Sequence, residues 1–283
     1  MKLKSAILTC ALSAIFISPI TTAQDATIER LVKTEELDYA SLKNLNFSDY
    51  ANQNVPPGTT FSIAEGVNKV AFSELTLGKN STLKLPKDAS KIEVVINKGT
   101  FHSGAKIVGQ RPDASDGKGY AGPDGTDITI FVHNANFILD NSVTSGGKDK
   151  FTIQSTGGVG GDGGRGKKGN NAKRKRCSGS DGHPAGNGGI GQRGGAGGNG
   201  GSILFNVRLA SNHPVITNRD IALNSVGGRG GNGGPGGAGG AGAPGKKCSL
   251  GFKRGGYGAG KSGPKGSKGA NGKSERVKLN LDF

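Results

Sequence analysis

The sequence predicts a mainly β protein: a small β-solenoid or stacked β-sheet scaffold, with long inserted loops that form a bundle of polyglycine-II helices. The first observation behind this prediction is that short segments of alternating apolar and polar residues recur along the chain. The second is that the long insertions between them carry glycine at every third position. The composition agrees, since 53 of the 283 residues are glycine and none is tryptophan, which does not favour an ordinary large core.

The N-terminus has the pattern of a secretory signal peptide, residues 1–23. Lys2 and Lys4 precede a mostly apolar run over residues 6–20, and small residues follow at 21–23. An uncleaved anchor is the alternative, but the run is short for a membrane span and no later segment replaces it. We therefore expect a bacterial protein exported to the periplasm, cell surface or medium.

Residues 24–56 are expected to form a separate N-terminal helical arm. Weak helical spacing is given by Ile28, Leu31, Val32 and Leu37. Pro56 and Pro57 then end the arm.

The β scaffold is expected over residues 57–156 and 202–226, with a final strand in 275–283. Alternating patterns occur first at Phe72–Leu77 and Thr82–Leu85. A fixed pattern, in which a β-branched or apolar residue recurs at every second position, then appears at 91–96, 127–132, 202–207 and 276–281. One such coil cannot bury its apolar face alone, so we expect neighbouring coils to stack. A β-sandwich is the competing fold, because the spacing fits both.

Two glycine-rich insertions, residues 157–201 and 227–274, separate these strands, and a shorter turn-rich one covers about 110–125. The long insertions contain period-three glycine tracts at 157–169, 188–200, 227–245 and 260–272. Polyproline-II geometry has three residues per turn, so every third residue lines one face. Glycine on that face lets another backbone approach and pair with its N–H and C=O groups.

Collagen and a flexible linker are the alternatives for these tracts. Collagen needs three chains and abundant proline, whereas the long insertions contain only Pro184, Pro235, Pro244 and Pro264. A linker needs no unbroken period. The pattern therefore favours a bundle, in which the tract at 260–272, with one glycine per triplet, is expected at the rim.

Each long insertion is expected to run outward along one tract and back along the other, with turns at 170–185 and 246–259. Cys177 and Cys248 lie in these turns, 20 and 21 residues beyond the first glycine of their insertions. At about 3.1 Å per residue, both would lie at the same height, roughly 60 Å from the strands. We expect a disulfide between them in an exported protein, with two free thiols as the alternative.

Basic residues gather in the same turns, and we expect them to form an anion-binding surface. They are Lys173, Arg174, Lys175, Arg176, Lys246, Lys247, Lys253 and Arg254. Phe252 and Tyr257 are expected to add aromatic contacts. A solvated loop without a partner is the alternative.

The charge distribution points the same way. Lys and Arg balance Asp and Glu over residues 1–150, whereas residues 151–283 contain 21 basic and 5 acidic residues, the whole net charge of +16. This favours an anionic glycan or cell-surface polymer such as lipopolysaccharide, teichoic acid or acidic polysaccharide, with nucleic acid as an unspecific partner. The alternative is that the charge only keeps the glycine tracts soluble.

Several motif matches carry no expected chemistry. Residues 255–262 match GxxxxGK[ST], but glycine-lysine repeats flank them where a P-loop needs a strand and a helix. Asp162 lacks the regularly repeated aspartates of calcium-binding repeats. No catalytic or metal motif surrounds His102, His133, His183 or His213. We expect no catalytic residues, metal or cofactor.

The GGxGGxGG tracts within 157–201 and 227–272 resemble those of polyglycine-II proteins, such as the receptor-binding adhesins of T-even-type phage tail fibres and the springtail antifreeze proteins. The first 16 residues of the third tract also resemble glycine-rich repeats of mycobacterial surface proteins. In the phage adhesins the turns at the far end bind the receptor, which implies a binding role for the tips here. The signal peptide and the charge of +16 depart from the phage and antifreeze patterns.

The function expected is therefore that of an exported, non-enzymatic structural or adhesive protein whose basic loop tips bind an anionic polymer or glycan. A purely structural envelope or matrix component is one alternative. A polysaccharide-active enzyme on a β-helix is another. Ice binding is disfavoured by the many lysines at outward positions.

Overall fold

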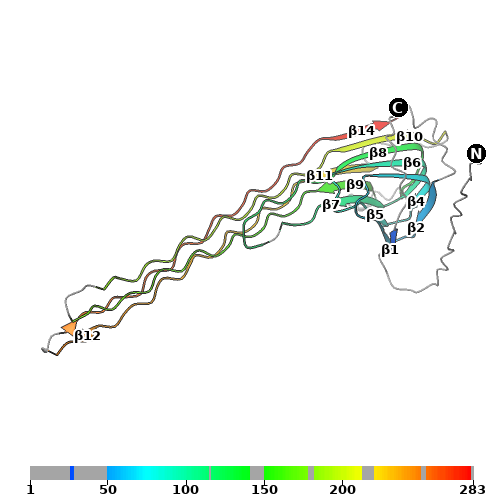
Figure 1. Ribbon diagram of the computed structural model, residues 1–283. Coiled ribbons are helices and arrows are strands. Elements are labelled where there is room, and N and C mark those ends of the chain that lie inside the picture. Colours follow the sequence, from blue (N-terminus) through cyan, green and yellow to red (C-terminus); the bar gives the residue numbers. More distant parts are fainter. Residues whose placement is uncertain are drawn as a thin grey trace, which may run out of the picture.

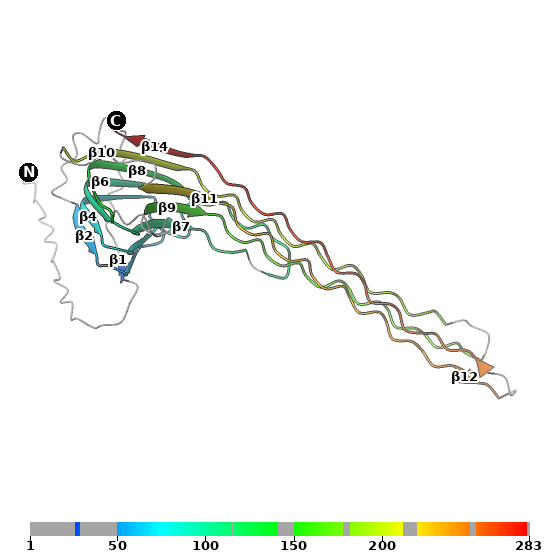
Figure 2. The ribbon, with the colours of Figure 1, turned by 180° about the vertical axis from the view of Figure 1, so that it is seen from behind.

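The computed structural model describes residues 26–28, 50–114, 116–140, 150–177, 182–211, 220–249 and 253–281. The predicted signal peptide lies outside these residues. Figures 1 and 2 show a scaffold of strands from which a long stalk of extended chain projects to one side. The stalk ends at the short strand β12 (Lys246–Lys247).

Two six-stranded parallel sheets form the scaffold, and the chain passes alternately from one to the other. Sheet I contains β1 (Ala26–Ile28), β3 (Thr60–Ile63), β5 (Thr82–Lys84), β7 (Lys106–Gln110), β9 (Phe151–Thr156) and β11 (Ile221–Val226). Sheet II contains β2 (Ala51–Val55), β4 (Lys69–Leu77), β6 (Lys91–His102), β8 (Asp127–Ile138), β10 (Ile203–Leu209) and β14 (Val277–Leu281). The prediction of a mainly β protein is confirmed, and the described residues include no helix.

The four segments with the recurring sequence pattern form adjacent strands of sheet II, and equivalent positions of the pattern pair with one another. Ile128 of β8 pairs with Ile92 of β6 on one side and Ile203 of β10 on the other, and Ile203 pairs in turn with Val277 of β14. Every pairing within the two sheets is parallel. The antiparallel pairing of a β-sandwich is therefore absent from both sheets.

The hydrophobic core lies between the sheets and draws side chains from both. One buried cluster contains Leu83, Ile107 and Ile153 of sheet I together with the paired isoleucines of sheet II, Ile92, Ile128 and Ile203. Phe101 contacts the ring of Phe151 at a centroid distance of 4.5 Å. Burying side chains of this size is the main favourable contribution to folding in a chain so rich in glycine.

The predicted N-terminal helical arm is wrong where the structure describes it. Ala26–Ile28 is strand β1, which pairs with β3, and Ala51–Val55 is strand β2, which pairs with β4. Parallel pairing with the neighbouring strand decides the conformation here, and Val55 at the end of β2 is 1% exposed. The remaining residues of the helical spacing, at 31–37, lie outside the described residues.

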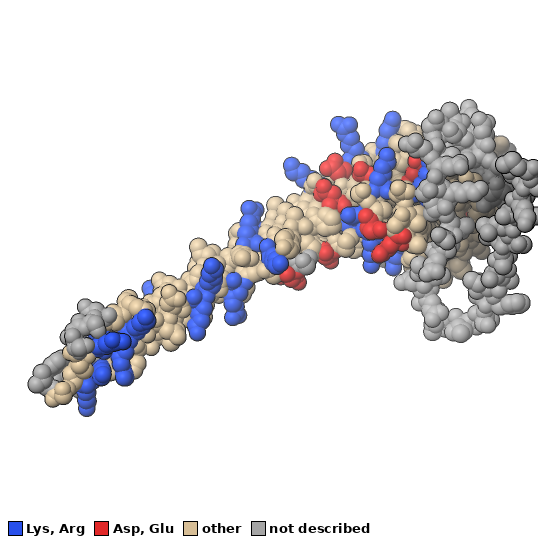
Figure 3. Space-filling model, in the orientation of Figure 1, with Lys and Arg blue, Asp and Glu red and all other residues tan. Residues whose placement is uncertain are grey.

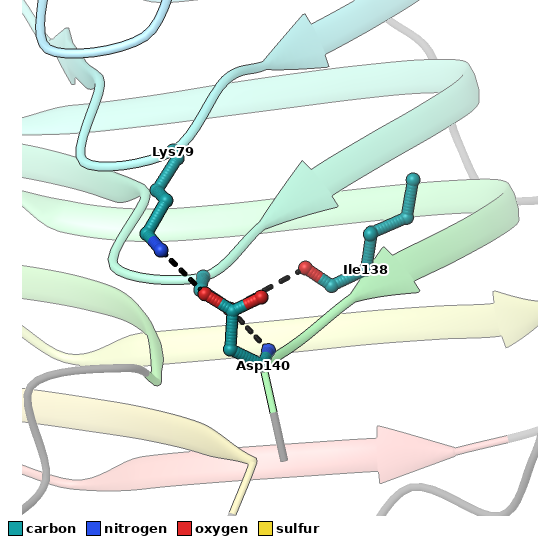
Figure 4. Close-up of polar contacts among 4 residues, drawn as sticks. Lys79, Ile138 and Asp140 are labelled. Carbon is teal, nitrogen blue, oxygen red and sulfur yellow. Dashed lines mark hydrogen bonds and ion pairs between the residues drawn. The ribbon is translucent and has the colours of Figure 1, made fainter. Parts of the chain in front are cut away.

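Polar contacts join the turns that follow strands β4, β6 and β8 at one corner of the scaffold (Figure 4). Asp140, just after β8, donates its N–H to the buried hydroxyl of Ser103, whose own N–H donates to the carbonyl of Ile138 at 3.0 Å. The Asp140 carboxylate forms a 2.5 Å ion pair with Lys79. Both charged side chains are about half exposed, so the ion pair contributes little and the buried hydroxyl is the stronger link.

The stalk contains four extended tracts, defined as tract 1 (157–172), tract 2 (186–200), tract 3 (227–245) and tract 4 (260–272). Tracts 1 and 3 continue the strands β9 and β11 of sheet I, whereas tracts 2 and 4 lead into β10 and β14 of sheet II. Outgoing and returning tracts therefore lie side by side in both ribbon views (Figures 1 and 2).

Backbone hydrogen bonds join the tracts with a fixed period of three residues. The N–H of Gly160 in tract 1 donates to the carbonyl of Arg229 in tract 3, and the pattern repeats every third residue up to Ala172 and Ala241. Tract 2 donates in the same way to tracts 1 and 4, tract 3 to tract 2, and tract 4 to tract 3. Tracts 2 and 3 thus lie at the centre, and tracts 1 and 4 at opposite edges.

Glycine is required at the buried positions because the backbones are too close for a side chain. A Cβ atom built on Gly194 or Gly231, as on most glycines of the tracts, would lie under 3.0 Å from backbone atoms of a neighbouring tract. Tract 4 lies at the rim as predicted: its glycines face the bundle, and the two residues between them are exposed. The short insertion packs at the base, where Gly122 donates to the carbonyl of Ala196.

Candidate functional site

The candidate site is the far end of the stalk, called the tip here and defined as residues 173–177, 182–185, 246–249 and 253–257. Because tracts 1 and 3 keep one register over their whole length, their ends arrive at the same height. Cys177 and Cys248 form a disulfide there, with their Cα atoms 5.8 Å apart. The predicted pairing of the two cysteines is confirmed.

A small antiparallel ladder closes the second turn of the tip. Strand β12 pairs with β13 (Lys253–Arg254), and Ala243 forms a bridge with Tyr257. The ladder reverses the chain between tracts 3 and 4, as the sequence predicted. The ladder orders the second turn, and the disulfide links that turn to the first.

Five of the eight predicted cations present exposed side chains at the tip: Lys173, Arg174, Arg176, Lys246 and Lys247. Lys175 is half-buried. The backbones of Lys253 and Arg254 are in β13, but their side chains and the whole of Phe252 lie outside the described residues. The tip therefore brings cations of both long insertions together around one disulfide.

Tyr257, predicted as an aromatic contact for a ligand, makes internal contacts instead at both ends of its side chain. Its hydroxyl donates a 2.7 Å hydrogen bond to the carbonyl of Gly182, and the ammonium of Lys175 lies 5.1 Å from its ring centroid. Arg174 Nε likewise donates to the carbonyl of Pro244 at 3.3 Å. These contacts join the two turns to each other.

The electrostatic field of the tip is positive because acidic residues are nearly absent from the stalk sequence. Within residues 163–201 and 227–273 the sole acidic residue is Asp181, which lies outside the described residues. On the face shown in Figure 3, Lys and Arg extend along the stalk to its end, whereas Asp and Glu gather on the scaffold and the stalk base. Such a field attracts and retains anions.

Sequence reasoning missed a set of Asp and Asn side chains that hold the tracts in register. Each is exposed or half-buried and accepts a hydrogen bond from a backbone N–H of a neighbouring segment. The pairs are Asp113 with Val159, Asp116 with Asp162, Asp124 with Asn199, Asp162 with Asn232, Asn171 with Ala241, Asn187 with Lys261 and Asn199 with Lys273. The signal available was their recurrence at non-glycine positions of the triplets.

No metal-binding cluster of His, Cys, Asp and Glu occurs among the described residues. Residues 255–262, the GxxxxGK[ST] match, run from the bridge at Tyr257 into extended tract 4 and lack the helix of a P-loop. His133 lies on β8, and its pKa is lowered by burial and, secondarily, by the charge of Arg208. Within the part of the chain described, we find no helix with the length and apolarity to cross a bilayer.

In comparisons with known proteins, no family model, curated protein or solved structure matches this chain. The function must therefore be inferred from the stalk and its tip.

Proposed function

We propose that this is an exported, non-enzymatic adhesive or structural protein, in which a β-solenoid scaffold projects a polyglycine-II bundle whose basic tip binds an anionic surface polymer or glycan. The alternation of the chain between two parallel sheets supports the solenoid. The period-three hydrogen bonds between extended glycine tracts support polyglycine II. The disulfide is compatible with export.

The observation that carries the functional proposal is the convergence of exposed cations from two insertions at the disulfide-linked end of the stalk. A flexible basic loop would have to be ordered on binding, at a cost in conformational entropy. Here the fixed register and the disulfide already restrict the described residues of the tip, so that cost is lower. A position far from the scaffold also suits contact with a surface polymer.

The test compares two triple variants that remove the same charge. We expect Lys173→Ser/Lys246→Ser/Lys247→Ser to bind lipopolysaccharide about tenfold more weakly than wild type at low salt, because each surface ion pair contributes only a fraction of a kcal/mol. The control Lys87→Ser/Lys91→Ser/Lys106→Ser, on exposed scaffold positions, should change affinity less than twofold.

Wild-type binding should also fall steeply as salt is added. Equal losses in the two variants would mean that net charge alone attracts the polymer, and would contradict a tip site. That result would favour the purely structural alternative, in which the cations solubilise the stalk.

A further inference from the structure

A row of cations runs along the edge of the stalk formed by tract 1 and its continuation into the tip. We call it the rim ladder; its members are Arg165, Lys167, Lys168, Lys173, Arg174 and Arg176. All six side chains are exposed. Each cation occupies one of the two outward positions of its triplet. Lys167 and Lys168 fill both positions of one triplet and Lys173 and Arg174 both of another, whereas the triplet between them carries Asn170 and Asn171. The third position, as at Gly166, is turned into the bundle.

The rim ladder is available for a ligand, because internal partners do not neutralise it. Among the described residues none of its six cations forms an ion pair, and Arg174 donates only Nε to a backbone carbonyl. The three members nearest the scaffold, Arg165, Lys167 and Lys168, have no described carboxylate partner although Asp162 lies only three residues before Arg165. The Asp162 carboxylate instead accepts from Asn232 of tract 3.

The geometry of the tract fixes the spacing of the ladder. Residues three apart lie on the same side of the tract, about 9.3 Å apart at a rise of about 3.1 Å per residue. Arg165, Lys168 and Arg174 share one such row, in which Asn171 takes the place between Lys168 and Arg174. The other row contains Lys167, Lys173 and Arg176, with Asn170 between the first two. From Arg165 to Arg176 the ladder spans roughly 34 Å and ends within the tip.

This spacing distinguishes between classes of polyanion. Duplex DNA carries one charge per about 1.7 Å, so most of its phosphates would lie between the steps of the ladder without a cation. Single-stranded nucleic acid is bound by aromatic side chains on which bases stack, and residues 163–177 contain none. A linear polysaccharide with one carboxylate on every second sugar has widely spaced charges, and guanidinium groups bind carboxylates in a bidentate manner.

We propose that the rim ladder is a lengthwise binding surface for a linear, sparsely charged acidic polysaccharide, which lies along tract 1 with one end at the tip. This rests on the proposed function, since the tip supplies the end of the same surface. The polymer would contact the stalk over several sugars rather than at a single terminal site. Affinity should therefore increase with the length of the saccharide until the ladder is covered.

Size-fractionated hyaluronan oligosaccharides, with one carboxylate on every second sugar, are the probe. Wild type should bind a hexadecasaccharide at least tenfold more tightly than a tetrasaccharide in fluorescence polarisation at low salt. The variant Arg165→Ser/Lys167→Ser/Lys168→Ser should bind the long oligomer about tenfold more weakly than wild type and the short one equally well. The matched control, Lys261→Ser/Lys265→Ser/Lys268→Ser, removes three exposed cations from the opposite edge and should leave both affinities within twofold of wild type.

Equal weakening by the two triple variants would overturn the rim ladder, as would an affinity of wild type that is independent of length. So would a single-stranded DNA of matching length that binds more tightly than the hexadecasaccharide. If binding of the short oligomer still depends on Lys246 and Lys247 in those cases, the tip proposal stands while the ladder proposal fails. If the ladder variant loses length dependence while Lys246→Ser/Lys247→Ser, which leaves the ladder intact, binds normally, the ladder stands and the tip proposal fails.

Discussion

At the scale of single residues, the stalk depends on the absence of a side chain at buried positions. Gly194 is buried in tract 2, and a Cβ there would lie under 3.0 Å from the carbonyl oxygens of Gly231 and Asn232 in tract 3. Since both contacts are backbone atoms, neither can move aside without disturbing the hydrogen bonds of the neighbouring tract. The period of three thus follows from how closely the tracts approach.

We therefore expect Gly194→Ala to lower the free energy of unfolding by about 1–3 kcal/mol, the usual cost of overpacking. The neighbouring Ala196→Ser, on an exposed position of the same tract, should change it by less than about 0.5 kcal/mol. Urea unfolding followed by circular dichroism measures both. Equal stability of Gly194→Ala and wild type would show that the tracts are more loosely packed than described.

His133 should make the stability of the scaffold depend on pH. Its pKa in the folded protein is lowered from the usual 6.5, first by burial and then by the charge of Arg208. As the pH falls through 6.5, the unfolded chain takes up the proton before the folded protein does, so folding becomes less favourable until the lower pKa of the folded state is passed.

The variant His133→Gln should lose less stability than wild type between pH 7 and pH 5, because glutamine does not titrate. Thermal unfolding at a series of pH values measures the difference. Parallel pH profiles for the two proteins would show that other groups cause whatever pH dependence is seen.

Residue-scale sequence reasoning succeeded for the cysteines and was incomplete for the polar residues. The height of Cys177 and Cys248 could be predicted because it depends only on counting residues along a regular tract. The internal role of Tyr257 could not, since its partner Gly182 is contributed by the other insertion. The Asn and Asp acceptors were missed for the same reason: Asn187 and Lys261 are 74 residues apart.

At the scale of elements, constant register is what joins the tracts to the strands. Tract 1 and tract 3 remain paired with the same offset from Gly160 to Ala172, and β9 and β11, which precede them, also pair without a shift. The register of β9 and β11 in the sheet therefore sets the register of tracts 1 and 3 in the stalk. Insertion or deletion of a residue within one tract should therefore shift all the residues beyond it relative to the neighbouring tracts.

Insertion of one glycine after Gly236 should displace the rest of tract 3 by one residue relative to tracts 1, 2 and 4. Side chains would then enter the buried positions from Ala238 onward, and Cys248 would move away from Cys177. Thiol counting under denaturing conditions should find two free cysteines in a large fraction of the variant. A fully oxidised disulfide with unchanged stability would contradict the fixed register.

Strands β4, β6, β8, β10 and β14 of sheet II were predicted well, because their side chains alternate with the pleat and repeat in phase. The arm at 24–56 was not, since Ala51–Val55 has little apolar alternation and gains its strand conformation from pairing with β4. The parallel pairing was likewise beyond the sequence, because alternation indicates which face is buried but not which strand lies alongside.

At the scale of the whole molecule, buried apolar residues and excess cations lie in different parts of the protein. The apolar core is confined to the scaffold, whereas the stalk is held by backbone hydrogen bonds and carries the excess of cations. The stalk is held together by the close packing of its glycine backbones. Because its described residues form no apolar core, its charged side chains remain at its surface. The field of the cations is therefore directed to solvent along the stalk and at its end (Figure 3).

The most direct test of the proposed function is lysine acylation footprinting of the wild-type protein, with and without saturating lipopolysaccharide, read by mass spectrometry. We expect Lys173, Lys246 and Lys247 at the tip to be protected at least several-fold, and the exposed scaffold lysines Lys87, Lys91 and Lys106 to react at unchanged rates. Protection of the scaffold lysines with the tip left reactive would contradict the account.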